Sequence, residues 1–332
     1  MLIVSDLHLR EETADTVFEQ VLPGVLEGAL GRGIRDITFL GDIFHIRYKI
    51  DAWIQNELYD VFSSWTLGYG RYIRILPGNH DQYNLDGRNA LEMFDEMSNV
   101  RVYTEAVTDE HGLWIPYRKD TDYTICTISE HEEKAVNQQG RRVCFFHNAI
   151  FGALMNDTFV DQEGIPPSIF KGFDIVLSGH YHKRQNLGNI YYIGSPYQIN
   201  AGESGQDKGY AIWDGNNLEY VTEQWGKRYH RISLGAKDTL SLDGIAPGDD
   251  VRVQTSVNVD PHAVAEQLIK AGIANHTVTP DVEPVQVRLD VPENSDLLRY
   301  AEAYVQKQDT PLDKGVLMNI YNEFRKEMGE TL

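Results

Sequence analysis

The sequence predicts an α/β fold in which two β-sheets pack face to face and helices cover the outside. Short apolar runs typical of strands alternate with longer amphipathic stretches typical of helices, and this alternation indicates a layered α/β protein. The predicted strands are Met1–Ser5, Asp36–Leu40, Tyr72–Leu76, Val100–Tyr103, Tyr123–Thr127, Arg142–His147, Asp174–Ser178, Ile190–Gly194 and Tyr210–Asp214. Two packed sheets would use a set of strands of this size.

Three amphipathic stretches between the first strands predict the covering helices. They are Thr13–Gly31, Ala52–Leu67 and Gly87–Met97. A helix with one apolar face buries that face on a sheet and leaves its polar face in water.

A connection rich in glycine and aspartate, Leu234–Asp250, predicts a domain boundary. The elements expected beyond it are a strand at Val251–Val259, a helix from Asp260 to Ala271, a strand at Val285–Asp290, and helices at Ser295–Lys307 and Pro311–Met328. We therefore expect a main domain at 1–233, a small α/β domain at 234–293 and a helical C-terminal region at 294–332.

The last predicted helix has an apolar stripe, formed by Val316, Leu317, Ile320, Tyr321 and Phe324. This stripe could pack on its own domain or receive a partner protein. The sequence leaves both interpretations open.

The composition excludes some classes of protein and disfavours others. The 332 residues carry a formal net charge of −20, which argues against tight non-specific binding of nucleic acid because that binding needs Lys and Arg to neutralise phosphates. No apolar run reaches the roughly 18 residues that a membrane helix needs, and Met1 opens directly into a core strand rather than a leader. We therefore expect a soluble, cytoplasmic protein.

Cys126 and Cys144 both lie in strand-like runs, which predicts two buried thiols rather than a disulfide.

The chemically informative residues lie where predicted strands end. In layered α/β folds, functional sites form at the carboxyl ends of strands. The motifs found there are Asp6-Leu7-His8, Gly41-Asp42, Gly78-Asn79-His80-Asp81, His147 and Gly179-His180-Tyr181-His182. Asp6 and His8 would face the same side if the backbone stays extended. Each motif alone could be a turn or a structural histidine, but their joint order along the chain favours a metal site.

In that order the motifs resemble the calcineurin-like metallophosphoesterase superfamily, over roughly residues 1–225. The resemblance implies a two-sheet α/β sandwich metallophosphoesterase with a small α/β cap domain and C-terminal helices. It also implies two divalent metal ions. Asp6, His8 and His182 would hold one, Asn79, His147 and His180 the other, and Asp42 would bridge both. Nitrogen and oxygen ligands without thiolates suit manganese, iron or zinc better than magnesium.

His80 resembles the family's catalytic histidine, which protonates the leaving oxygen or stabilises the crowded phosphorus centre. Asp81 could orient it. The implied reaction is hydrolysis of a phosphate ester by a two-metal-activated hydroxide.

Finer motifs resemble the SbcD-type DNA repair nucleases rather than phosphoprotein phosphatases, which have a second aspartate and Arg-Gly after Gly-Asp. Here Gly41-Asp42-Ile43-Phe44-His45 replaces that pattern, and His45 is a second candidate catalytic residue because some members have a histidine there. Ile193-Gly194-Ser195-Pro196 and Asp207-Lys208-Gly209-Tyr210 also match this branch. The overall likeness is to recombination endonuclease subunits of tailed phages.

This branch implies manganese, DNA as the substrate, exonuclease or endonuclease activity, and a role in DNA repair and recombination. It further implies an SMC-like ATPase partner of the SbcC type, bound through Leu297–Met328, and a location in the host cytoplasm if the gene is carried by a phage. A homodimer would form through Ala52–Leu67 and Gly87–Met97, although a helix covering its own sheet explains their apolar residues equally well.

Two other functions remain open at this stage. The acidic charge would suit an enzyme of the same chemistry that acts on small phosphate esters. A DNA-end scaffold without catalysis is the other alternative, and the intact set of metal ligands counts against it. A few basic residues could line the approach to phosphate or could simply be solvated: Arg10, Arg47, Lys183, Arg184, Lys208, Lys227 and Arg228.

Overall fold

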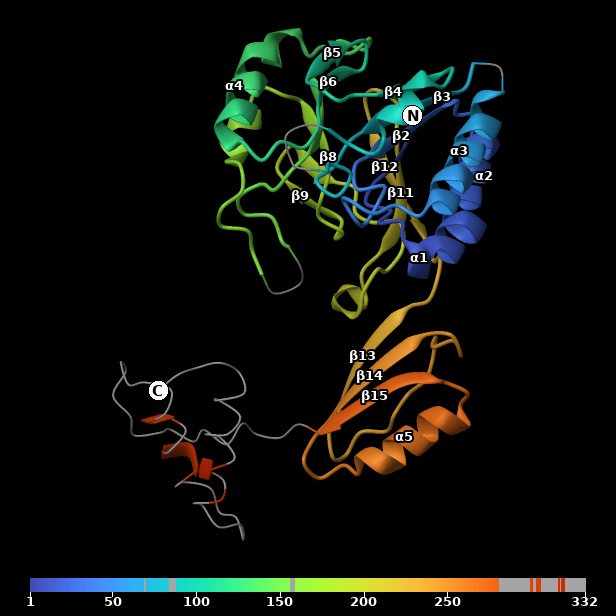
Figure 1. The fold of residues 1–332 in the computed structure, drawn as a ribbon, viewed down its shortest axis with the longest axis vertical. Helices are drawn as coiled ribbons and strands as arrows, with labels where there is room; N and C mark the ends of the chain where they lie inside the picture. Colours follow the sequence, from blue (N-terminus) through green and yellow to red (C-terminus); the bar gives the residue numbers. More distant parts are fainter. Residues whose placement is uncertain are drawn as a thin grey trace.

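A computed structural model describes residues 1–68, 70–83, 88–155 and 159–280, with a few positions beyond 298. These residues form two six-stranded sheets and one three-stranded sheet (Figure 1). The first sheet has the order β12 (Leu218–Glu223), β11 (Lys208–Trp213), β1 (Leu2–Val4), β2 (Asp36–Leu40), β3 (Tyr72–Leu76), β4 (Val100–Val102). The second has the order β5 (Val107–Asp109), β6 (Gly112–Ile115), β7 (Val143–His147), β8 (Ile175–Gly179), β10 (Ile190–Tyr192), β9 (Gln185–Leu187).

The central strands of each sheet run parallel, and antiparallel strands lie at the edges. β1, β2, β3 and β4 pair in parallel in the first sheet, as do β6, β7, β8 and β10 in the second. Parallel strands that are buried on both faces have nearly continuous apolar sequences, and β1 and β7 fit this pattern. The predicted α/β sandwich is confirmed.

The two sheets pack against each other through large apolar side chains. Trp114 of β6 lies between Tyr103 and Phe145, with ring centroids 4.2 and 3.9 Å away and nearly parallel planes. Ile3 of β1 and Leu40 of β2 belong to the same buried cluster. This shared core sets the spacing of the sheets, and therefore the spacing of the residues at their carboxyl ends.

Helices cover the outer face of each sheet, as Figure 1 shows. The first sheet is covered by α1 (Glu11–Thr16), the π-helical turn η1 (Val17–Val21), α2 (Leu22–Gly31), α3 (Ala52–Thr66) and the 3₁₀ turn η2 (Glu92–Glu96). The second is covered by α4 (Thr121–His131), with the 3₁₀ turns η3 (Glu132–Lys134) and η4 (Pro167–Phe170). A further 3₁₀ turn, η5 (Ala201–Glu203), precedes β11.

The expected helix Thr13–Gly31 is interrupted by the π-helical turn that ends just before Pro23. Proline has no N–H to donate to the preceding turn, and a π-helical turn is one way to accommodate the loss. The expected helix Gly87–Met97 is only the short η2, in which Leu91 and Phe94 reach the core three residues apart, a spacing that a 3₁₀ turn also provides. Gly87 lies outside the described residues.

The predicted strand Tyr123–Thr127 is wrong, because these residues lie within α4. Asp120 caps the helix by accepting a hydrogen bond from the Tyr123 N–H at 2.9 Å, and Thr124, Thr127 and Ile128 are buried at helical spacing. The β-branched composition of the run suggested a strand. Cys126 is consequently exposed on α4, so the expectation of two buried thiols holds only for Cys144.

A small parallel sheet follows the main sandwich. β13 (Tyr229–Leu234), β14 (Asp250–Thr255) and β15 (Asn275–Pro280) pair in that order, and α5 (Pro261–Lys270) packs on them. β13 joins this sheet, so the sheet begins at Tyr229, before the predicted boundary at 233/234. The division into domains 1–233, 234–293 and 294–332 stays a prediction.

The predicted strand Val285–Asp290 and nearly all of the predicted helices at 295–307 and 311–328 lie outside the described residues. Within the described residues, no helix is long and apolar enough to cross a membrane.

Asp249, which directly precedes β14, generates a stability prediction. Its carboxylate accepts the N–H groups of Arg228 and Ala246 at 2.9 Å each and contacts His230 Nε2 at 2.8 Å. Burial opposes ionisation, but these backbone donors and the imidazole hold the pKa of Asp249 below its ordinary value of 3.8. A lowered carboxyl pKa stabilises the fold at pH values above 3.8, and this contribution is lost as pH falls below 3.8 through the lowered pKa of the folded state.

We expect Asp249→Asn to destabilise the small sheet by about 1–3 kcal/mol at pH 7 and by less near pH 3. Hydrogen exchange of the amides of β13 and β14 measures this locally. Glu266→Gln, on the exposed face of α5, is the control and should have little effect. An equal loss at both pH values would contradict the assignment.

Candidate metal centre

Five strand ends from both large sheets meet at one place. Asp6 and His8 follow β1, Asp42 follows β2, Asn79 and His80 follow β3, His147 ends β7, and His180 and His182 follow β8. Two groups of ligand atoms each lie within 4.8 Å of one another, one formed by Asp6, His8 and His182 and the other by Asp42, His147 and His180. A carboxylate and two imidazoles at such spacing can hold a divalent metal ion.

The backbone at this place is strained. Five non-glycine residues among those described have a positive φ, and four of them belong to the two groups: Asp6 (55°), His8 (46°), Asp42 (53°) and His180 (93°). Each such residue costs on the order of 1–3 kcal/mol and persists where the surrounding structure imposes it, often at functional sites. The extended backbone expected for Asp6 and His8 is therefore wrong. Left-handed turns bring the two side chains together.

Asp42 belongs to the second group and also faces the first. Its Oδ1 is 3.5 Å from Nε2 of His147, and its Oδ2 is 3.6 Å from Nε2 of His8. Oδ1 also accepts the backbone N–H of His80 at 2.8 Å. Each carboxylate oxygen thus faces a different imidazole, the arrangement that a carboxylate shared by two metal ions needs.

His147 has one ring nitrogen that makes no hydrogen bond. Its Nδ1 donates to the carbonyl oxygen of Leu40 at 2.6 Å, while its buried Nε2 makes no hydrogen bond. Buried polar atoms without a partner are rare in native proteins. A metal ion would satisfy this nitrogen, so the residues present fit such an ion. Burial opposes protonation, but the carboxylates of Asp42 and Asp6 raise the pKa of His147 to about 9.

The group around Asp6 has a similar arrangement. Nε2 of His8 lies 2.9 Å from Nε2 of His182, and Asp6 accepts the His180 N–H at 3.0 Å through Oδ1. Burial lowers the pKa of His8 and raises that of Asp6. Two imidazole nitrogens this close, beside a carboxylate, would serve as ligands of one cation.

Asn79 adjoins the second group through His180, whose Nδ1 lies 3.0 Å from the Asn79 Oδ1. Burial and the neighbouring His147 lower the pKa of His180 to about 3, so its ring is neutral, as a metal ligand must be. All seven ligands expected from the sequence are therefore gathered in one place.

His80 and His45 lie at the edge of this cluster. Nδ1 of His80 donates to the backbone carbonyl of His45 at 2.7 Å, and the two rings stack with centroids 5.4 Å apart. His45 also reaches His8, with their Nδ1 atoms 3.1 Å apart. Asp81 does not orient His80, contrary to expectation. Its buried carboxylate accepts the N–H groups of Phe44 and Gly78 and so fixes the loops that carry the two histidines.

Two side chains lie directly behind this site: Glu203, which the sequence did not single out, and Lys208, which it singled out only as a possible basic residue near phosphate. Glu203 Oε1 is 2.8 Å from Nδ1 of His182, and Lys208 Nζ is 2.6 Å from Glu203 Oε2. Lys208 is therefore buried in an ion pair and does not line an approach to phosphate. Arg184 donates to the Val221 carbonyl at 2.6 Å, so it also has a structural contact. A lone glutamate at the end of a short 3₁₀ turn has no spacing pattern that could have identified it.

Sequence similarity relates the chain to a phage exonuclease subunit. No protein-family model matches the chain. Exonuclease subunit 1 of Enterobacteria phage T4 is 25% identical over 310 residues, which cover 87% of this chain and 88% of the T4 protein. A dimetal phosphatase from Danio rerio shares 10% identity over 67% of this chain and 92% of its own, with a TM-score of 0.37. A TM-score of this size supports no argument, and the sheet order of the chain itself defines the fold.

Gly78 generates a prediction for the metal centre. A Cβ at this position would collide with the Asp42 side chain and would lie 2.7 Å from Nε2 of His147. We expect Gly78→Ala to weaken metal binding by roughly 10-fold or more, because these two side chains would have to shift. Isothermal titration with Mn²⁺ measures the change.

Gly31→Ala is the matched control, because a Cβ there meets nothing within 4 Å. Unchanged Mn²⁺ affinity in Gly78→Ala would show that the two side chains have more freedom than the structure indicates.

Proposed function

We propose that this protein is a metal-dependent phosphodiesterase that cleaves DNA. The observation that carries the proposal is the position of Asp42 between two groups of ligands, each of which includes imidazoles. Two divalent ions at such a site supply Lewis-acid stabilisation of phosphate oxygens and activation of water at neutral pH. We propose Mn²⁺ as these ions, because nitrogen and oxygen donors without thiolates suit it.

The roles proposed for the ligands follow their grouping. Asp6, His8 and His182 would hold one ion, Asn79, His147 and His180 would hold the other, and Asp42 would contact both. The Leu40 carbonyl engages the Nδ1 proton of His147, so Nε2 would be the nitrogen that binds the ion.

We assign His80 the catalytic role of proton donor. Its Nδ1 is held by the His45 carbonyl, so Nε2 is the nitrogen free to give a proton to the leaving oxygen. His45 stacks on His80 and contacts His8, which supports the proposal that it assists at the same phosphate.

The DNA substrate is supported by the relative from phage T4, whose name describes an exonuclease subunit. That name also supports a complex with other subunits, and we propose an SMC-like ATPase bound through Leu297–Met328. Such a partner would supply DNA affinity that a chain of net charge −20 lacks. We also propose a role in repair or recombination, in the host cytoplasm if the gene belongs to a phage.

A homodimer is a further proposal. Ile54, Leu58 and Phe62 of α3 are buried in their own domain, but Trp53 is 47% exposed and Met93 is 41% exposed. The Gln55 side chain joins α3 to Met93. Sedimentation at micromolar concentration tests this, and a strict monomer would count against it.

One assay separates the nuclease from the small-ester alternative. The purified protein with Mn²⁺ is offered linear duplex DNA, hairpin DNA and bis-p-nitrophenyl phosphate, with Asp42→Asn as the control for contaminating nucleases. We expect cleavage of DNA. Cleavage of the small ester alone, even with an ATPase partner present, would favour the small-ester enzyme. No cleavage of any of them by the metal-loaded protein would favour the scaffold.

The role of His80 gives a second test. We expect His80→Ala to lower kcat by roughly 10²–10⁴-fold, because the proton donor is lost, while both metal ions stay bound. His276→Ala is the matched control, since Nδ1 of His276 also contacts a backbone carbonyl, that of Ile273 at 2.9 Å, but in the small domain. Full activity in His80→Ala would exclude the role.

A further inference from the structure

The ring of His182 is held from behind by a buried carboxylate. Nδ1 of His182 lies 2.8 Å from Glu203 Oε1, and Glu203 is only 5% exposed. Lys208 Nζ lies 2.6 Å from Glu203 Oε2, so Glu203 is paired as a carboxylate. A carboxylate only accepts hydrogen bonds, so Nδ1 of His182 donates to it and Nε2 faces Asp6 and His8.

Glu203 is itself fixed by several donors. Its Oε2 accepts from Lys208 Nζ at 2.6 Å and from the Ile199 N–H at 3.1 Å, and its Oε1 accepts from Asn200 Nδ2 at 2.9 Å. Both oxygens are therefore occupied, and the carboxylate has little freedom to rotate away from His182.

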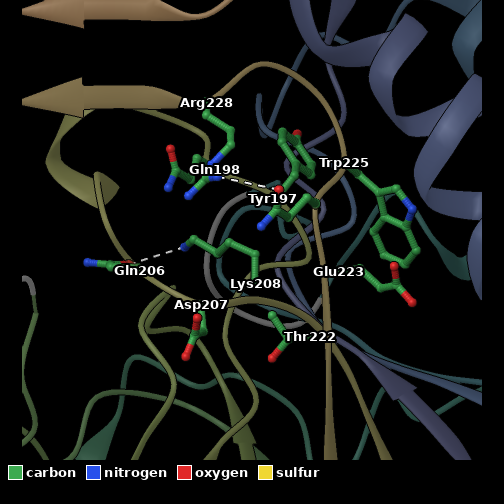
Figure 2. Close-up of a pocket in the computed structure, with 10 residues that line it drawn as sticks. Tyr197, Gln198, Gln206, Asp207, Lys208, Thr222, Glu223, Trp225 and Arg228 are labelled. Carbon is green, nitrogen blue, oxygen red and sulfur yellow. Dashed lines mark hydrogen bonds between the residues drawn. The ribbon is translucent and has the colours of Figure 1, made fainter. Parts of the chain in front are cut away.

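Lys208 links the ring of His182 to its backbone. Nζ of this 4% exposed lysine contacts Glu203, and it also donates to the carbonyl oxygen of His182 at 3.0 Å. Further contacts go to Ser195 Oγ at 2.8 Å and to Gln206 Oε1 at 3.2 Å, the latter drawn in Figure 2. Lys208 is the first residue of β11, which pairs with β1 in the first sheet. The position of Lys208 is therefore fixed by the backbone of that sheet.

Fold stability alone does not explain why the ion pair of Glu203 and Lys208 is buried behind His182. Replacing a buried ion pair by apolar residues of similar size is often neutral or stabilising. A carboxylate that receives the second nitrogen of a metal-bound histidine instead fixes the tautomer and the orientation of the ring. The contact to His182 therefore points to a role in the metal centre.

We propose that Glu203 is a positioning residue for the half of the metal centre formed by Asp6, His8 and His182, and that Lys208 holds Glu203 in place. The proposal rests on the proposed function only in taking these residues as ligands. It concerns metal binding and not the choice of substrate.

The test measures Mn²⁺ binding to the full chain by isothermal titration and by electron paramagnetic resonance of the bound ion pair. We expect Glu203→Gln to weaken the binding of one of the two Mn²⁺ ions by roughly 10–100-fold and to leave the affinity for the other unchanged. The resonance spectrum should change from that of a coupled pair to that of a single ion at limiting Mn²⁺.

Two further variants separate positioning from the simple loss of a buried charge. The double variant Glu203→Gln with Lys208→Met removes both charges together and should fold even if the single variant does not, while still weakening the same ion. Asp249→Asn removes another buried carboxylate that contacts a histidine, in the small domain, and should leave both ions unchanged.

Wild-type affinity for both ions in either Glu203 variant overturns the proposal. Equal weakening in Asp249→Asn overturns it as well, because the effect would then be general destabilisation. A wild-type protein that binds two ions but cleaves no phosphodiester contradicts the proposed function and leaves the Glu203 assignment standing. A wild-type protein that binds no Mn²⁺ contradicts both.

Discussion

The carboxylate of Asp42 faces imidazoles that come from two different sheets, and the rest of the site depends on this arrangement. His8 follows β1 in the same sheet as Asp42, whereas His147 ends β7 in the other. The two can share one carboxylate only if the sheets stay at a fixed separation. The buried cluster of Ile3 and Leu40 from the first sheet with Trp114 and Phe145 from the second provides that separation, because a close-packed core resists compression.

The same arrangement explains the strain at the strand ends. Asp6, His8 and Asp42 take up left-handed backbone conformations so that side chains from neighbouring parallel strands turn toward one point. Glycines make room where no side chain fits: a Cβ at Gly41 would meet the His147 ring, and one at Gly179 would meet the Leu40 carbonyl. The packing free energy of the sandwich offsets the cost of these conformations.

The segment from Gln198 to Ser204 connects the site to the small domain. Glu203 in this segment contacts His182, while Gln198 Oε1 accepts the Tyr229 N–H at 2.7 Å and Ser204 Oγ accepts the Arg231 N–H at 3.1 Å. Tyr229 and Arg231 belong to β13, the first strand of the small sheet. Glu203, which contacts the candidate ligand His182, thus directly precedes Ser204, which contacts the first strand of the small sheet.

The sequence by itself determined the sandwich and the set of candidate ligands. Buried parallel strands need unbroken apolar runs, and strand ends with Asp, Asn and His in a set order are visible without coordinates. It failed at Tyr123–Thr127, where β-branched residues lie in a capped helix, because local composition does not record burial at helical spacing. Only the tertiary structure decided which groups face one another. The positive φ of Asp6 and His8, the Asp81 contacts to Phe44 and Gly78, and the link from Glu203 to His182 all join residues through space, and spacing along a chain carries no information about such contacts.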